Sequence, residues 1–298
     1  MNRLRRSELA VPGNNPKMIA KAATSAADLV FCDLEDAVAE NEKSDAREEV
    51  VRALENLDWG TKTRAVRVNG LDDARSYEDF VVLVEGAGRF LDVVILPKVS
   101  SAEEVRWVDR LLGYLETKAG LQRRIGLELL IEGVEGLIHV EEIAKSSPRV
   151  EALVFGAGDM SASQGVRVTE TLLPGDSYPG DFWHYARCKI VVAARAAKVA
   201  AVDSPYTNFN DPEGYRAECL RSYSLGYAGK WAIHPKQIVV ANDVFSPSEA
   251  EVKNARAVLD AYEEATARGV GAIQIDGVLI DEGIARIMRG VLEVAGHD

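Results

Sequence analysis

Short apolar segments recur along the chain, and most of them end on a residue that can take part in chemistry. Asp33 follows the segment 29–31, and Glu132 follows the segment 127–131. Short segments rich in β-branched residues and bounded by Gly and Pro are typical of buried parallel strands. We therefore expect eight strands, over residues 8–11, 29–33, 64–68, 93–96, 125–131, 152–155, 200–203 and 231–233.

Stretches of helical character separate these segments. Asn15-Pro16 is a helix-start signal, with Asn at the N-cap and Pro at the first position. Ser100-Ser101-Ala102-Glu103-Glu104 contains the serine-to-glutamate spacing of a capping box, and a helix follows it. The other expected helices cover residues 17–24, 44–54, 77–85, 136–144, 183–198, 212–225, 235–242, 247–267 and 281–293.

Eight strands that alternate with helices predict an α/β fold, a (β/α)₈ TIM barrel, with its site at the C-terminal mouth. We expect the barrel over residues 1–246 and a C-terminal helical extension over residues 247–298. The extension cannot be a ninth barrel unit, so it packs outside, forms an oligomer contact or covers the site as a lid. The long stretch after 152–155, which contains Pro174 and Gly175, is expected to be a functional loop.

Composition narrows the class of function. The chain has 298 residues, and its apolar runs are far shorter than the roughly 20 residues that span a bilayer. A net charge of −12 argues against nucleic acid and anionic membrane as partners. The basic N-terminus lacks the apolar stretch of a secretion signal. Cys32, Cys188 and Cys219 are odd in number and widely spaced, which favours reduced thiols in a cytoplasmic protein.

Two carboxylates form the first candidate constellation. Glu132 and Asp159 follow neighbouring strands, and Gly133, Gly156 and Gly158 beside them allow the backbone to turn sharply. Paired carboxylates without evident basic partners favour a hard cation such as Mg²⁺, which takes few protein ligands. The alternative is that one or both stabilise the starts of the following helices.

Three further acids crowd the end of the second strand. Asp33, Glu35 and Asp36 repel one another unless a cation balances them, so some of them are candidates to hold the waters of a metal. Arg67 lies inside an apolar strand, where an unpaired guanidinium would be costly. We expect it to meet a carboxylate or a substrate oxyanion at the barrel mouth; a structural ion pair across the barrel is the alternative.

Basic residues gather near the first strand. Lys17 and Lys21, with Arg5 and Arg6 nearby, place positive charge at a loop and at a helix N-terminus, which suits a phosphate group. An ordinary solvated basic face is the competing interpretation.

Ordered motifs stand at the strand ends. They are Arg6-Ser7-Glu8-Leu9-Ala10-Val11-Pro12-Gly13, Asp33-Leu34-Glu35-Asp36-Ala37-Val38, Val66-Arg67-Val68-Asn69-Gly70, Leu96-Pro97-Lys98-Val99, Ile131-Glu132, Phe155-Gly156-Ala157-Gly158-Asp159 and Gly229-Lys230-Trp231-Ala232-Ile233-His234-Pro235. Together they resemble the malyl-CoA lyase and citrate lyase β-subunit family nearly from end to end. Within it, Tyr178-Pro179-Gly180-Asp181 and Ile275-Asp276-Gly277 are most similar to the malyl-CoA/β-methylmalyl-CoA lyases. Ser204 and Tyr206 depart from the family's glycine and phenylalanine, which leaves the exact acyl specificity open.

The resemblance implies a set of residue roles. It implies a Mg²⁺ ion, with Mn²⁺ as an alternative, held by Glu132 and Asp159, and an arginine at Arg67 that contacts substrate. It implies that Asp276, on the C-terminal segment of a neighbouring subunit, closes over the site of a homotrimer or homohexamer. The basic residues of the first loop, represented by Arg6 and Lys17, would hold the phosphates of coenzyme A.

The implied reaction is a reversible Claisen-type cleavage of malyl-CoA or β-methylmalyl-CoA to glyoxylate and acetyl-CoA or propionyl-CoA. Arg67 would stabilise the enolate oxygen, and Asp276 would handle the proton on the α-carbon. Asp36 or a metal-bound water would take the hydroxyl proton. The alternatives are a citramalyl-CoA lyase, with pyruvate as the 2-oxo acid, a (3S)-malyl-CoA thioesterase, and a citrate lyase β-subunit.

Overall fold

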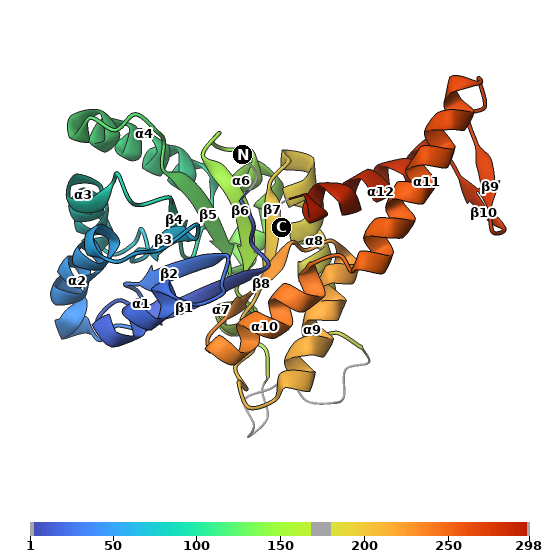
Figure 1. Cartoon of the computed structure of the whole chain (residues 1–298). Helices are drawn as coiled ribbons and strands as arrows, with labels where there is room; N and C mark the ends of the chain where they lie inside the picture. The colour runs from blue at the N-terminus through green and yellow to red at the C-terminus, as the bar shows by residue number, and fades with distance from the viewer. Residues whose placement is uncertain (1–2, 168–179, 297–298) are drawn as a thin grey trace. The chain divides into compact units, whose positions relative to one another are not determined.

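The computed structural model describes residues 3–167 and 180–296 and contains the closed parallel barrel that the apolar pattern predicts. The strands pair in chain order, and β8 pairs with β1 to close the ring (Figure 1). The strands are β1 (Ser7–Pro12), β2 (Leu29–Asp33), β3 (Thr63–Arg67), β4 (Val93–Leu96), β5 (Gly126–Ile131), β6 (Val150–Phe155), β7 (Ala200–Asp203) and β8 (Gly229–Ala232).

Helices lie outside the ring of strands, as Figure 1 shows. In chain order they are α1 (Pro16–Ala23), the short 3₁₀ helix η1 (Glu40–Glu42), α2 (Lys43–Asn56), α3 (Arg75–Ala87), α4 (Ala102–Ala119), α5 (Val134–Ile138), α6 (Val140–Ala144), α7 (Ala157–Gln164), α8 (His184–Ala197), α9 (Pro212–Leu225) and α10 (Pro235–Phe245). The start signals act as predicted. The Asn15 side chain accepts a hydrogen bond from the Met18 backbone N–H at 3.1 Å, and Ser101 and Glu104 form the capping box.

Two expectations about helices were wrong. The helix expected over residues 136–144 is divided into α5 and α6, because His139 adopts φ −100° and ψ 12°, outside the helical range. Helix α7 begins directly after β6, where a loop was expected. Half of its eight residues are Gly, Asp or Ser, which have lower helix propensity than Ala, so the sequence pattern did not reveal the helix. Residues 168–179 of the expected loop, with Tyr178 and Pro179, lie outside the described residues.

The barrel interior has an apolar layer between two polar ones. Side chains alternate along each strand, so every second residue points inward. Glu8 and Glu128, from the early parts of β1 and β5, are fully buried on one side of the apolar layer. Asp33 and Arg67 lie on the other side, at the C-terminal strand ends. The apolar layer comprises Leu29, Phe31, Ala65, Val93, Ile95, Leu130, Ala152, Val154, Val202 and Trp231.

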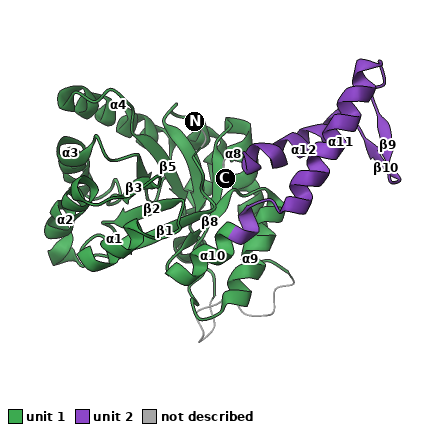
Figure 2. Cartoon of the chain, in the orientation of Figure 1, with its two compact units in different colours: residues 1–242 green, residues 243–298 purple. Residues whose placement is uncertain are grey.

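The chain divides into two compact units, residues 1–242 and 243–298 (Figure 2). The second unit contains α11 (Glu249–Ala267), the hairpin of β9 (Ile273–Ile275) and β10 (Val278–Ile280), and α12 (Glu282–Ala295). It has a small core of its own, made by Val258, Leu259, Tyr262, Ile280 and Ala285. In the described part of the chain, no helix is both long and apolar enough to cross a membrane.

Candidate active site

A cavity of about 480 Å³ opens where the barrel strands end. Its wall combines charged groups with an apolar floor, the composition expected of a site that orients a small molecule. The charged residues that line it are Asp33, Asp36, Arg67, Glu132 and Asp159, and its larger apolar side chains are Met18, Phe31, Leu130, Pro205, Trp231 and Ile233.

Arg67 is held by a carboxylate on the adjacent strand. Asp33 and Arg67 are register partners of β2 and β3, and Arg67 donates from Nε at 2.8 Å and from Nη2 at 2.6 Å to the two Asp33 oxygens. Its Nη1 lies 3.0 Å from Glu35 Oε2. Burial alone would lower the pKa of Arg67, but the hydrogen bonds and charge of Asp33 outweigh it and raise that pKa. The ion pair is therefore local, not across the barrel, and it fixes the plane of the guanidinium.

Trp231 lies beneath this guanidinium. The Arg67 Cζ atom is 5.7 Å from the centroid of the indole ring, and the Phe31 ring lies 4.5 Å from it. An arginine over an aromatic face gains electrostatic stabilisation. Barrel closure pairs β8 with β1, and inside the closed barrel the Trp231 ring meets Phe31 of β2 and Arg67 of β3, residues far apart in the sequence.

Lys98 turns the chain after β4. Its backbone has φ 53°, an uncommon conformation for a residue with a side chain. Its N–H donates to Glu132 Oε1 at 2.8 Å, and its Nζ lies 2.6 Å from Glu35 Oε1. This contact with Glu35 raises the pKa of Lys98, whereas burial raises the pKa of Glu35 against the lowering effect of Arg67.

Glu132 is almost completely buried, and this burial, followed by the charge of Asp159, raises its pKa to about 8. Gly156 makes room for it: a Cβ atom at that position would lie 2.5 Å from the Glu132 Cβ and 2.7 Å from its Oε2. The glycine is thus required by close approach and not by the sharp turn that the sequence suggested. Asp159 lies in the first turn of α7, so it also interacts favourably with that helix N-terminus.

The rim carries more negative than positive charge. Five carboxyl groups face only two cations, and the described residues bring no three His, Cys, Asp or Glu side chains together as metal ligands. Glu132 and Asp159 form a pair of carboxylates, of which Glu132 is buried. Such a pair fits Mg²⁺, which needs few protein ligands because it keeps several of its own waters. The groups counted are Asp33, Glu35, Asp36, Glu132 and Asp159 against Arg67 and Lys98.

A buried network supports the loop after β2, and sequence reasoning missed it. Lys43 Nζ donates to the backbone oxygens of Leu34 and Glu35, both at 2.9 Å, and to Asn69 Oδ1. Asp79 accepts from both the backbone and the side-chain amide of Asn69. Lys43 and Asp79 belong to α2 and α3, not to strand ends. The sequence signal that could have revealed this network is a charged residue on the apolar, buried face of each helix, Lys43 on α2 and Asp79 on α3.

The two predicted coenzyme-binding residues lie at opposite ends of β1. Lys17 is exposed in the first turn of α1, beside the cavity residue Met18. Arg6 precedes β1, and its guanidinium donates to both oxygens of Asp28, at 2.9 and 2.8 Å. This placement, before β1 and against Asp28, gives no support to the predicted contact of Arg6 with coenzyme phosphates, which stays a prediction.

Asp276 occupies the tip of the β9–β10 hairpin. Asp276 has φ 48° and Gly277 has φ 83°, and two positive φ values in a two-residue loop are typical of a type I′ turn. Asp276 and Gly277 therefore form the turn of this hairpin. Its role as a lid residue of a neighbouring subunit stays a prediction.

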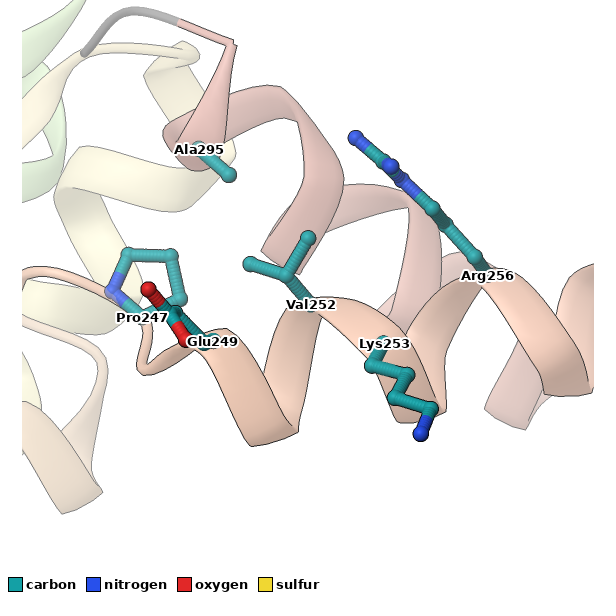
Figure 3. A pocket seen from close by; sticks show the side chains of 6 residues that line it. All are labelled: Pro247, Glu249, Val252, Lys253, Arg256 and Ala295. Carbon is teal, nitrogen blue, oxygen red and sulfur yellow. The ribbon is translucent and has the colours of Figure 1, made fainter.

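A second hollow, of about 410 Å³, lies within the second unit (Figure 3). In Figure 3, Val252 points towards Ala295, whereas Lys253 extends from the other side of α11. The hollow contains a single carboxylate, Glu249, and no buried charged group. Its chemistry does not match that of the barrel cavity, which we take as the candidate active site.

Comparison with known proteins agrees with this geometry. The family model described as HpcH/HpaI aldolase/citrate lyase matches residues 6–235. The chain is 44% identical to an L-malyl-CoA/β-methylmalyl-CoA lyase of Rhodobacter capsulatus, over 94% of this chain and 91% of the relative. It is 36% identical to a (3S)-malyl-CoA thioesterase of Cereibacter sphaeroides, over 93% and 89%. It also resembles the crystal structure of CitE from Mycobacterium tuberculosis in complex with magnesium, acetoacetate and coenzyme A, with a TM-score of 0.77, 28% identity and coverage of 99% and 100%.

Proposed function

The chain belongs to the HpcH/HpaI aldolase/citrate lyase family, and we propose that it is a Mg²⁺-dependent lyase that reversibly cleaves malyl-CoA or β-methylmalyl-CoA. The products would be glyoxylate and acetyl-CoA or propionyl-CoA. The observation that carries this proposal is the meeting of Glu132, Asp159 and Arg67 in one cavity at the barrel mouth. The 44% identical lyase, aligned over 94% of the chain, supports the choice of substrate.

Glu132 and Asp159 would hold the metal ion. Bound there, Mg²⁺ supplies a Lewis acid for the carboxylate and neighbouring oxygen of the substrate. Glu132 is the more buried of the two carboxylates, and burial and the charge of Asp159 raise its pKa, so a bound cation would favour its ionised form. The Lys98 N–H keeps one Glu132 oxygen oriented, which limits the positions that the carboxylate can adopt.

Arg67 would stabilise the enolate oxygen of acetyl-CoA or propionyl-CoA. Charge at that oxygen develops only as the carbon–carbon bond breaks, so a fixed cation beside it favours the transition state. Asp33 occupies Nε and one terminal nitrogen of Arg67 and so orients the guanidinium before substrate binds. The thioester would then meet the second N–H of Nη2, or Nη1, which already lies 3.0 Å from Glu35 Oε2.

Two carboxylates would move protons. Asp36 lines the cavity with a side chain that is 57% exposed, and would take the hydroxyl proton at Oδ in the cleavage direction. Asp276 of a neighbouring subunit would return a proton to the α-carbon, in a homotrimer or homohexamer. Lys17, exposed beside the cavity, would bind a coenzyme A phosphate.

A thioesterase is the second candidate, because a (3S)-malyl-CoA thioesterase is 36% identical over 93% of the chain. The two reactions differ in the bond that breaks. A lyase releases glyoxylate and acetyl-CoA from malyl-CoA, whereas a thioesterase releases malate and free coenzyme A. A citramalyl-CoA lyase would instead accept pyruvate in the condensation direction.

The test is to incubate the purified protein and Mg²⁺ with malyl-CoA, and separately with acetyl-CoA and glyoxylate or pyruvate, and to identify products by mass. We expect glyoxylate from malyl-CoA and malyl-CoA from the condensation. Malate as the main product would replace the lyase with the thioesterase. Glu132→Gln should abolish turnover, and the control Glu103→Gln, at a side chain 85% exposed on α4, should retain it.

A further inference from the structure

A second group of charged residues lies inside the barrel, beyond the apolar layer that floors the cavity. Glu8 and Glu128 extend inward from β1 and β5 and are completely buried. Arg5 Nε donates to Glu128 Oε1 at 2.8 Å and lies 3.7 Å from Glu8 Oε1. Arg5 Nη2 donates to Glu151 at 2.6 Å, so one guanidinium serves three carboxyl groups.

This group leaves two carboxyl oxygens without a hydrogen-bond partner. They are Glu8 Oε1 and Glu128 Oε2, whereas Glu8 Oε2 accepts a hydrogen bond from Trp231 Nε1 at 2.8 Å. If both glutamates were ionised, one negative charge inside the barrel would lack a counter-charge, because Arg5 is shared with Glu151. An uncompensated buried charge is among the most costly features of a protein interior. The Glu8 and Glu128 carboxyl groups lie within hydrogen-bond reach of each other, so one proton shared between them removes that charge.

Within residues 3–167 and 180–296, Arg5 is the only cation that forms an ion pair with Glu8. Arg3, a further cation at this end of the barrel, donates to Glu151 at 3.1 Å. From β8 the neighbour is Trp231, a donor without charge, and the adjacent layer is apolar. Burial, followed by the charge of Glu128, accordingly raises the pKa of Glu8 well above its usual range, and burial raises the pKa of Glu128.

We propose that Glu8 is a neutral carboxylic acid at neutral pH that donates a hydrogen bond to Glu128, accepts one from Trp231 and thereby positions the floor of the cavity. The indole of Trp231 is the link, because its N–H bonds to Glu8 while its ring lies beneath Arg67. Glu8 touches no substrate and is a positioning residue. The effect on Arg67 rests on the function proposed above, whereas the shared proton does not.

Infrared spectroscopy tests the proton directly. At neutral pH the protein should show carbonyl bands of protonated carboxylic acids that move when glutamate is isotopically labelled. Glu132, whose pKa is raised to about 8, contributes such a band, so the band of Glu8 is the one that persists in Glu132→Gln and disappears in Glu8→Gln. Labelling requires no substitution, so a complete absence of such bands can be detected in the unmodified protein. The matched control is Glu116→Gln, since both Glu116 oxygens accept from Arg149, at 2.6 and 2.7 Å, and Oε1 also accepts from the Ile125 backbone N–H, so neither oxygen lacks a partner. The proposal would be overturned if no carboxylic acid carbonyl band moved when glutamate is labelled.

The pH dependence of stability gives a second readout. A carboxyl group with a raised pKa in the folded protein contributes stability below its unfolded pKa and loses it as the pH rises towards the folded value. Glu8→Gln keeps both hydrogen bonds through the amide and removes this titration. The variant should therefore gain stability relative to the unmodified protein as the pH rises above the usual range of glutamate. An identical pH dependence in the two proteins would refute the shared proton.

Kinetics test the positioning role. Glu8→Leu removes the acceptor of the Trp231 N–H, so we expect kcat to fall about tenfold to a hundredfold with a small change in KM. Glu8→Gln should restore most of that loss, which a role in bulk packing alone would not produce. Normal kcat in folded Glu8→Leu would refute the positioning role. Absence of lyase activity in the unmodified protein would refute the proposed function. The infrared result would still show whether Glu8 and Glu128 share a proton.

Discussion

Replacement of Gly156 by alanine tests the geometry of the proposed metal site. The added methyl group would lie 2.5 Å from the Glu132 Cβ and 2.7 Å from its Oε2, whereas ordinary contacts begin at 3.4 Å. Gly156 has φ −107° and ψ 86°, without a positive φ, so the strain of this substitution comes from the contact with Glu132. One of the two residues must move by about 1 Å, and the buried Glu132 carboxylate is the group next to the new atom.

The expected magnitudes follow from this displacement. Insertion of a methyl group into a close-packed region typically costs about 1–3 kcal/mol, so the barrel should remain folded with a lower melting temperature. A displaced metal ligand should weaken Mg²⁺ binding by roughly 10- to 100-fold, the effect typical of a change in the groups that orient a ligand. An error of about 1 Å in the site can cost a further factor of the order of a hundred in kcat/KM.

Titration calorimetry with Mg²⁺ and thermal unfolding of the metal-free protein measure the two effects separately. Gly158→Ala is the matched control, since it lies two residues away in α7 and its added methyl group would meet no atom within 4 Å. We expect the control to keep the metal affinity of the unmodified protein and to gain up to about 1 kcal/mol of helix stability. Equal Mg²⁺ affinities in Gly156→Ala and in the unmodified protein would refute the assignment of Glu132 as a ligand.

Three further predictions concern the site. EDTA should abolish turnover, and Glu132→Ala or Asp159→Ala should remove Mg²⁺ binding in calorimetry without unfolding the barrel; turnover of either variant without divalent metal would contradict this. Arg67→Lys should lower kcat/KM by roughly a hundredfold or more in steady-state assays, because an ammonium group cannot keep the two-point bond to its carboxylate partner. Normal kinetics in Arg67→Lys would show that Arg67 has only a structural role. Mixing Asp276→Ala with Glu132→Ala subunits should regain part of the activity if Asp276 completes a neighbour's site; inactive, verified mixed oligomers would count against a shared site, and full turnover of Asp276→Asn would remove the residue from the mechanism.

Much of the architecture can be predicted from the sequence because its causes are local. Strands buried on both faces are mostly apolar and end at or near a polar residue, so β2, β4 and β7 were predicted with the ends that the structure has. Helix starts at Asn15 and Ser101 depend on hydrogen bonds to residues three positions away, which spacing alone reveals. Helix α7 was not predicted because the intrinsic helix propensity of its residues is weak. Its position directly after β6 in the barrel, and not this propensity, makes the segment helical.

Strand direction explains the outcome for the site residues. A residue at the C-terminal end of a barrel strand, or just after it, lies at the mouth of the barrel. Arg67, the last residue of β3, and Glu132 and Asp159, which follow β5 and β6, therefore line one cavity. Arg6 precedes its strand, and the same rule, strictly applied, would have excluded it from the mouth.

The sequence by itself determined which residues reach the mouth of the barrel, because the length and polarity of each apolar segment are local properties. Only the tertiary structure decided their partners. Asp33 meets Arg67 through the register of β2 and β3, and Glu8 meets Trp231, 223 residues away, because the barrel closes between β8 and β1. Pairing across strands depends on register and closure, which are set by the packing of the whole barrel, and no local pattern in the chain encodes them.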